Sequence, residues 1–436
     1  YIRHVAGVEE KIAEKAVAQY HELNTSLAFE SLADFAQSLS RPRKILLMVN
    51  AGTAVDQVFE ALIPMLSTGD IVMDGGNSHY EDTQRRQQLA AAHGLHFLGV
   101  GVSGGESGAL NGPAIMCGGD AEAYRQVAPM LDQIAAKDAA GQACATLVGP
   151  GGAGHFVKMA HNGIEYAEMQ LLAEVYSALR WDSGYTPDEV ADILAHWAED
   201  GLQSYLLEIT IDILRHREGA DWLLDKISDK AAHKGTGSWA SIAASELGAP
   251  LTMMTEALFA RFVAALRDSR QAMAAAYVAP HSRVVLDKQD LKYAYQLARW
   301  INHHQGFQFI QLASERHDWQ VNLSELARIW TNGCIIRSEL MQQAREYLSG
   351  RSDLLLHTGL RDTIVALWPS LQRTVSALSY SSRAYPCLMS ALAALNGSTT
   401  AHSAAHLIQA QRDYFGAHLY ERLDDPSGKK YHTQWI

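Results

Sequence analysis

The sequence has few cysteines and fewer basic than acidic residues. Four cysteines occur among 436 residues, they lie far apart, and no two form a CxxC pair. Neither a disulfide framework nor a zinc site is indicated, so we expect all four to be packing residues. The net charge of -12 argues against a nucleic-acid or anionic-membrane partner, because those surfaces attract clustered Lys and Arg.

Long hydrophobic runs are also absent. We find no uninterrupted apolar stretch of the about eighteen residues that a membrane helix needs, and no leader peptide with a cleavage site. The cytosol is therefore the expected compartment. What the sequence does contain is 48% hydrophobic and only 19% charged residues, which is enough apolar material for large cores in two or three domains.

The first third of the chain alternates between two patterns. Short apolar runs predict buried strands at residues 44–50, 71–74, 96–100 and 145–148. Helical spacing of apolar residues lies between them, at 55–65, 81–93 and 121–136. Strands that alternate with helices predict a parallel sheet with crossover helices.

A glycine-rich break at residues 149–154 ends this alternation. Helical periodicity then continues to about residue 407, and a polar, turn-rich tail follows. We therefore predict a Rossmann-like α/β domain over residues 1–150, a large all-helical domain over 151–408, and a C-terminal tail over 409–436 that lies against another part of the protein or another subunit.

One helical segment carries polar residues on a single face. They follow the spacing i, i+3, i+4, i+7 and i+8, while most other positions are apolar: Lys158, His161, Asn162, Glu165 and Tyr166. The pattern fits a buried helix with an inward polar stripe, or equally a solvated face. A Lys and a Glu that converge in a cleft suit two proton transfers, because burial lowers the pKa of Lys and raises that of Glu.

This segment, HFVKMAHNGIEYAEMQLL at residues 155–172, resembles the central motif of the 6-phosphogluconate dehydrogenases. The resemblance implies that Lys158 is the general base on the 3-hydroxyl of the substrate. It implies that Glu165 protonates the enediol after carbon dioxide leaves. His161, Asn162 and Tyr166 then correspond to positions that bind the substrate.

Two glycine turns are similar to segments of the same family. GVSGGESGAL, at residues 101–110, resembles the substrate loop, which implies contacts from Ser103, Gly104 and Gly105 to the substrate carboxylate region. DGGNS, at 74–78, follows a predicted strand at the edge where open α/β sheets hold ligands. Its Asn77 matches a position near both substrate and nicotinamide. From the residues alone, a Gly-Gly turn is most often only a turn.

Two further segments imply a phosphate site. KGTG, at 234–237, fits either a phosphate cradle or a helix-ending turn. The family has a similar segment that binds the substrate phosphate together with an Arg. The resemblance therefore implies that Lys234, Thr236 and Arg261 bind the phosphate. QAQRDYFGAHLY, at 409–420, resembles the family tail, whose Arg and His reach the site of the neighbouring subunit. Those residues are Arg412 and His418, and a homodimer is implied.

The nucleotide side departs from the family. Relatives begin with a strand, a glycine-rich loop and a helix that hold the pyrophosphate. We expect this unit of roughly 25 to 30 residues to be missing from the sequence, which would weaken NADP binding. Ala6-Gly7-Val8 stands where relatives bind the 2'-phosphate, so NADP and NAD both remain open. The residues assigned to the cofactor by resemblance are Val49, Asn50, Ala51 and Asn77.

The leading hypothesis is oxidative decarboxylation of 6-phosphogluconate to ribulose 5-phosphate by a homodimer with NADP, a step of the pentose phosphate pathway. The sequence has no recognisable carboxylate cluster for a divalent ion, and the new carbonyl at carbon 3 accepts the electrons that decarboxylation releases. Two alternatives stay open: a non-decarboxylating 3-hydroxy acid dehydrogenase, against which the KGTG and tail motifs argue, and a catalytically impaired sugar-phosphate binder, which only the expected missing loop favours.

Overall fold

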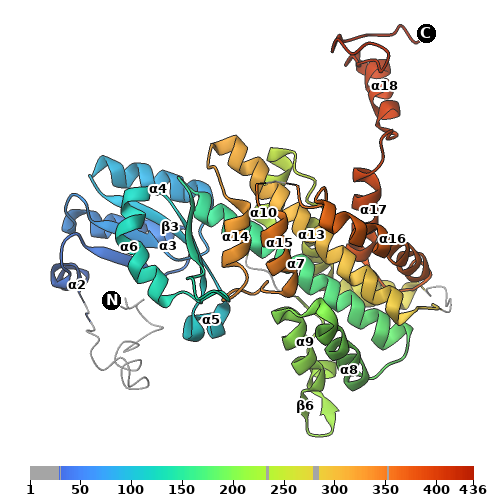
Figure 1. The fold of residues 1–436 in the computed structure, drawn as a ribbon, viewed down its shortest axis with the longest axis horizontal. Coiled ribbons are helices and arrows are strands. Elements are labelled where there is room, and N and C mark those ends of the chain that lie inside the picture. The colour runs from blue at the N-terminus through green and yellow to red at the C-terminus, as the bar shows by residue number, and fades with distance from the viewer. Residues whose placement is uncertain (1–28, 30, 232–234, 278–283, 351–352) are drawn as a thin grey trace.

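The computed structural model describes residues 29, 31–231, 235–277, 284–350 and 353–436. Three predictions lie outside these ranges. They are the loss of the first strand and glycine loop, the assignment of residues 6–8, and the phosphate ligand Lys234. Figure 1 shows a sheet domain at one end of a long helical body, from which the C-terminal segment projects. In the described ranges, no helix is long and apolar enough to cross a membrane.

Five strands form the sheet in sequence order: β1 (Lys44–Leu47), β2 (Ile71–Asp74), β3 (His96–Ser103), β4 (Ala114–Gly118) and β5 (Ala145–Gly149). The pairs β1–β2, β2–β3 and β4–β5 are parallel, with Leu47 opposite Asp74 at the end of the first pair. The helices of this domain are α2 (Leu32–Ser38), α3 (Thr53–Leu62), α4 (Tyr80–Ala92), α5 (Gly105–Asn111) and α6 (Ala121–Ile134). Side chains from both faces of the sheet pack into two separate apolar clusters.

The prediction of a wholly parallel sheet was wrong at β4, which pairs antiparallel with β3 and was not predicted as a strand. Only residues 104–113 connect β3 to β4, and they contain the short helix α5. A parallel crossover needs about a dozen residues or more, so a link of this length returns the chain in the opposite direction.

The helical body is built around two long helices, α7 (Ala153–Ser177) and α13 (Lys288–His317), which pack against each other. The prediction of an almost strand-free body is confirmed, since its one described hairpin is short, β6 (Arg217–Glu218) with β7 (Asp221–Trp222). The other helices are α8 (Pro187–Trp197), α9 (Tyr205–Arg215), α10 (Thr236–Leu247), α11 (Thr252–Ala265), α12 (Arg267–Ala276), α14 (Leu323–Ile329), α15 (Glu339–Tyr347), α16 (Thr358–Leu378), α17 (Pro386–Ser398) and α18 (Ala405–Gly416).

Helix α7 joins the two parts because it packs directly on the sheet as well as on the helical body. Glycines make this approach possible. A Cβ atom at Gly154 would stand 2.5 Å from the carbonyl oxygen of Gly99, and one at Gly101 would stand 2.6 Å from Cβ of Lys158. Larger side chains would push the helix off β3, so these glycines set where the polar face of α7 lies.

Candidate active site

Lys158 lies at the junction of the sheet and α7. Its side chain packs over Gly101 of β3, and the residue is only 7% exposed. Burial lowers the pKa of Lys158 below the ordinary lysine value, while the nearby Glu165 and Cys334 act in the opposite direction. An amine with a lowered pKa loses its proton more readily near neutral pH, as a general base must.

The next turns of α7 place two more ionisable groups beside Lys158. His161 is fully buried, its Nε2 lies 3.1 Å from Oγ of Ser103, and its Nδ1 lies 3.8 Å from Oε2 of Glu165. Burial, helped by the charge of Lys158, holds the pKa of His161 well below its usual range, so the ring is neutral. The side chain of Glu165 is 21% exposed, so it is less buried than that of His161.

The last polar turn of this face meets the helical body. The guanidinium carbon of Arg261, on α11, lies 3.5 Å from the ring centroid of Tyr166. Burial lowers the pKa of Arg261, and Tyr166 and Glu165 oppose that shift. The start of α10 packs on the same ring, since a Cβ atom at Gly237 would stand 2.7 Å from it. Thr236 is the first residue of α10, so the described part of this segment, residues 235–237, begins a helix and does not end one.

Loops at the carboxyl edge of the sheet hold the other predicted residues. Ser103 ends β3 and is buried, and Gly104 and Gly105 follow it with positive φ angles. Asn77 is exposed in the loop after β2. Val49, Asn50 and Ala51 lie in the loop after β1. The two loops touch, because a Cβ atom at Gly76 would stand 3.1 Å from the carbonyl oxygen of Val49.

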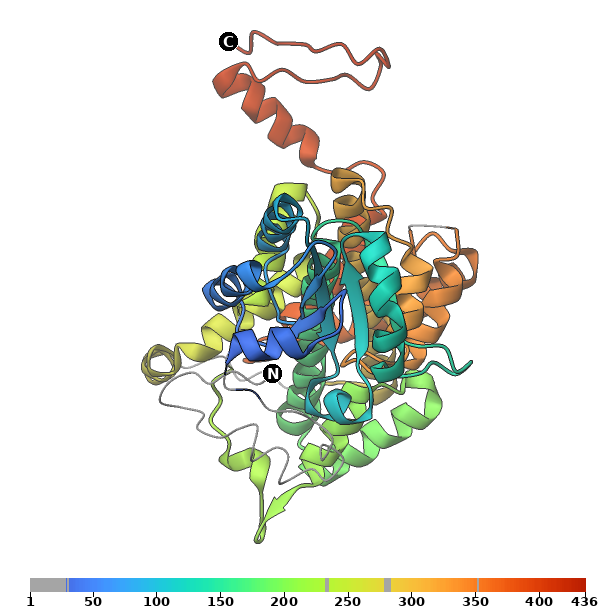
Figure 2. The same ribbon diagram turned by 90° about the vertical axis from the view of Figure 1, so that its left-hand side faces the viewer.

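Arg412 and His418 do not join this site within one chain. Arg412 lies on α18, and His418 follows that helix in the tail. Figures 1 and 2 show α18 and the tail projecting from the body in both views. A role for these side chains in a site like this one therefore requires a second copy of the chain.

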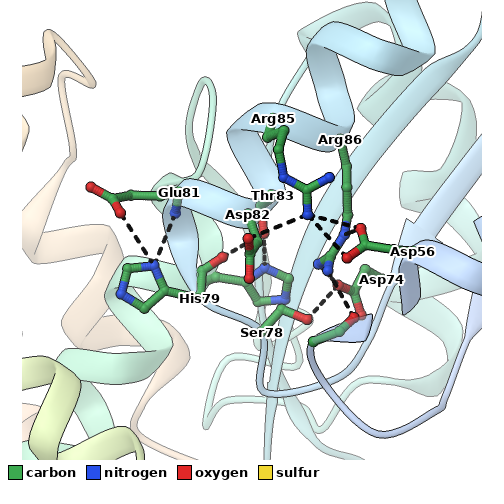
Figure 3. Close-up of polar contacts among 11 residues, drawn as sticks. Asp56, Asp74, Ser78, His79, Glu81, Asp82, Thr83, Arg85 and Arg86 are labelled. Carbon is green, nitrogen blue, oxygen red and sulfur yellow. Dashed lines mark hydrogen bonds and ion pairs between the residues drawn. The ribbon is translucent and has the colours of Figure 1, made fainter. Parts of the chain in front are cut away.

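Sequence reasoning missed a buried network behind the two loops (Figure 3). Arg86 of α4 is fully buried and contacts Asp56 of α3 and Asp74 of β2. Nearby, Oγ1 of Thr83 lies 2.6 Å from Nδ1 of His155, one turn before Lys158 on α7. The partners come from four different elements, and the paired residues lie 12 to 72 positions apart, so no helical or strand periodicity marks them.

Comparison with known proteins places the chain in one family. Residues 4–149 match the NAD binding domain of 6-phosphogluconate dehydrogenase, and residues 154–435 match the 6-phosphogluconate dehydrogenase C-terminal domain. A decarboxylating 6-phosphogluconate dehydrogenase of Staphylococcus aureus (strain N315) is 43% identical over 414 residues, which cover 93% of this chain and 88% of the relative. That of Aggregatibacter actinomycetemcomitans is 42% identical over 416 residues, covering 93% and 85%.

A solved structure agrees with the sequence relatives. The Plasmodium falciparum 6-phosphogluconate dehydrogenase, studied in apo form and in complexes with NADP+ and with 6-phosphogluconate, superimposes with a TM-score of 0.91 at 33% identity. The match covers 97% of this chain and 92% of that one. With matches to both domains, the Rossmann-like and all-helical fold class is confirmed. The chain belongs to the family of decarboxylating 6-phosphogluconate dehydrogenases.

Proposed function

We propose that this protein oxidises 6-phosphogluconate with NADP and releases carbon dioxide and ribulose 5-phosphate. Its relatives are named decarboxylating 6-phosphogluconate dehydrogenases, and the similar Plasmodium falciparum enzyme forms a complex with NADP+. The observation that carries the proposal is the position of Lys158 and Glu165, which share one face of α7 beside Ser103 and His161. That arrangement supplies a buried base and a more open acid within one site.

In the proposed reaction, Lys158 takes the proton of the 3-hydroxyl as hydride leaves carbon 3. NADP, when bound, supplies the acceptor for that hydride. The resulting β-keto acid loses its carboxylate as carbon dioxide, the bonding electrons move toward the carbon-3 carbonyl, and the oxygen of that carbonyl takes the proton back from Lys158 to give an enediol. Glu165 then protonates the former carbon 2, which is carbon 1 of ribulose 5-phosphate, while the enediol hydroxyl on the former carbon 3 returns its proton to Lys158. Neutral His161 and Ser103, hydrogen-bonded to each other, orient the substrate next to Lys158.

Substrate anchoring is assigned to both ends of the α7 face. Asn162, Asn77 and the turn at Ser103, Gly104 and Gly105 would bind the carboxylate and hydroxyl end. For the phosphate we propose Tyr166, Arg261, Lys234 and Thr236 from one chain, completed by Arg412 and His418 of a second copy. In support, the guanidinium of Arg261 contacts the ring of Tyr166, and the start of α10 packs on the same ring. The positive charge of Arg261 therefore lies near the start of α10.

We assign the cofactor to the sheet domain, residues 1–150. Residues 151–408 are then the domain that binds the substrate and forms the dimer, and residues 409–436 are the tail that reaches the second copy. The loops with Val49, Asn50, Ala51 and Asn77 lie at the carboxyl ends of β1 and β2, where open parallel sheets bind nucleotides. Asn50, Ala51 and Asn77 are exposed, so a ligand has access to them. NADP is proposed over NAD.

A product assay tests the function. The purified protein is incubated with 6-phosphogluconate and either NADP or NAD, and reduced nucleotide, carbon dioxide and ribulose 5-phosphate are all measured. We expect one carbon dioxide for each reduced nucleotide and faster turnover with NADP. Reduction without carbon dioxide would instead support a non-decarboxylating dehydrogenase. Sugar-phosphate binding with no reduction of either nucleotide would support an impaired binder, and both results contradict the proposal.

A further inference from the structure

Arg86 is a fully buried cation that contacts two ligand-facing loops at once. Its Nε donates to Oδ1 of Asp56 at 2.7 Å, and its Nη2 donates to the carbonyl oxygen of Gly52 at 3.0 Å. Its Nη1 lies 3.4 Å from Oδ2 of Asp74. The first two contacts hold the loop of residues 48–52 and the start of α3, and the third reaches the end of β2.

Asp74 passes this constraint on to the loop of residues 75–79. Its Oδ1 accepts from the backbone N–H of Gly76 at 3.0 Å, and its Oδ2 accepts from Oγ of Ser78 at 2.6 Å. Asn77 lies between these two anchored residues. Figure 3 shows Arg86 between Asp56 and Asp74, with Ser78 on the far side of Asp74. The carboxylate thus holds the backbone of Gly76 and the side chain of Ser78, on the two sides of Asn77.

The same network extends to the catalytic helix. Thr83, on the helix that carries Arg86, contacts His155 of α7. The charge of Asp74 also acts on His155, because it opposes the lowering of the His155 pKa that burial causes. One side of α4 therefore touches both loops and the start of the helix that bears Lys158.

We propose that Arg86 is a positioning residue that fixes the loops of residues 48–52 and 75–79 relative to each other, and so aligns the nicotinamide with the substrate. The inference rests on the proposed function, because it takes Asn50, Ala51 and Asn77 as ligand contacts. Hydride transfer requires the reacting atoms to lie about 3 to 3.5 Å apart, and an error of about 1 Å costs on the order of 100-fold in rate.

Arg43 offers a matched control in the same sheet. It is also a buried arginine paired with an aspartate, since its Nη1 lies 2.8 Å from Oδ2 of Asp70 and its Nε donates to the carbonyl oxygen of Ala36 at 2.7 Å. This pair lies just before β1 and β2, at their amino ends, whereas Arg86 serves their carboxyl ends. Both pairs are buried, but only one borders the predicted site.

The test compares Arg86→Lys with Arg43→Lys. A lysine keeps the charge but cannot span three acceptors in different directions. We expect both variants to lose thermal stability. Only Arg86→Lys should lower kcat by between about 10-fold and 100-fold and weaken NADP binding in calorimetry by about fivefold or more. The affinity for 6-phosphogluconate should fall less than the affinity for NADP in Arg86→Lys, since Asn77 is the one proposed substrate contact on the two loops that this network holds. In Arg43→Lys the affinity for 6-phosphogluconate should change less than about twofold.

Asp56→Asn is the second variant, in case Arg86→Lys does not fold. Asp56 is partly exposed, and Arg86 holds its pKa below the usual value although burial opposes this. We expect the same loss of kcat and NADP affinity, but smaller. Suppose that the unmutated protein is active, and that Arg86→Lys and Asp56→Asn have the same kcat and the same NADP affinity as Arg43→Lys. The inference about Arg86 is then overturned, while the proposed function stands. If the unmutated protein neither binds NADP nor turns over, the proposed function fails as well.

Discussion

Two lysines of the described chain are buried in different ways. Lys292, on α13, is 3% exposed and forms an ion pair with Asp200. Lys158 is 7% exposed and faces a histidine and a partly exposed glutamate, and burial lowers its pKa. The first arrangement gives the ammonium group a carboxylate partner, whereas burial in the second favours loss of the proton of Lys158. Burial is common to both lysines, so the difference between them lies in the groups they contact.

The residue-scale prediction is that Lys158→Met reduces kcat by about 10³-fold, because the proton of the 3-hydroxyl then has no acceptor. Binding of 6-phosphogluconate, followed by calorimetry, should remain measurable, since the proposed anchors are other residues. Lys292→Met is the matched control and should lower stability without a comparable loss of kcat. Near-normal turnover by Lys158→Met would refute the assignment of the base.

The pH dependence of kcat/KM follows from the same residue. A base must be neutral to act, so kcat/KM should rise with pH and level off above the pKa of Lys158, which lies below the ordinary lysine value of about 10.4. Glu165 acts to raise that pKa. Glu165→Gln should therefore move the midpoint of the residual activity to lower pH, besides slowing turnover. A midpoint that moves to higher pH would contradict this electrostatic account.

The spacing of Lys158, His161 and Glu165 predicted their common face, because helical geometry alone determines which residues are neighbours. It could not decide between a buried and a solvated face. That choice depends on Gly101 and Gly154, which let α7 rest on β3, and on Arg261, which comes from α11. Contacts between elements far apart in sequence leave no periodic signal.

At the scale of elements, strand prediction succeeded where the strands are separate, short apolar runs. The run at residues 71–74 is β2 as predicted, and the run at 96–100 is the first part of β3. The prediction failed at β4. Only residues 104–113 separate this strand from β3, and the sequence pattern did not distinguish its apolar residues from the glycine-rich segment at 101–110. The direction of β4 follows from that short connection and not from its composition.

The tail folds around one carboxylate. Asp413 of α18 accepts from Leu419 N–H, Thr433 N–H and Trp435 Nε1 at 2.9 to 3.1 Å, and its Oδ1 lies 3.0 Å from His432 Nδ1. Burial acts to raise the pKa of Asp413, but these hydrogen bonds, led by that of His432, lower it to about 2. The bond to Leu419 fixes the backbone beside His418, where both flanking residues have positive φ.

The element-scale prediction is that Asp413→Ala disorders the tail. Trp435 should then show red-shifted fluorescence. The value of kcat/KM should fall at least about tenfold, because Arg412 and His418 are no longer held in fixed positions relative to each other. Asp424→Ala is the control, since Asp424 is exposed and pairs only with Arg422 in the same tail. A folded tail in Asp413→Ala, or equal losses in both variants, would contradict the prediction.

In the wild-type protein, the stabilising effect of Asp413 is present above its unfolded pKa, near 3.8, and is lost as pH falls through about 2.

At the scale of the whole molecule, the projecting tail leaves apolar side chains uncovered in the single chain. These side chains are more than half exposed: Leu407, Ile408, Tyr414, Phe415, Leu423 and Ile436. A projecting segment with this surface suits exchange between two copies related by a two-fold axis. Such an exchange would carry Arg412 and His418 to the other chain, where Arg261 and Tyr166 line the end of the α7 face that we propose for the phosphate.

Subunit complementation tests this central claim most directly. Lys158→Met and Arg412→Ala chains, each of which we expect to be inactive or severely impaired as a homodimer, are produced together in equal amounts. If the tail of one chain completes the site of the other, each mixed dimer has one intact site, and activity should recover to about a quarter of wild type. If activity stays at the level of the separate variants although mixed dimers form, Lys158 and Arg412 do not act across the interface, and the account is contradicted.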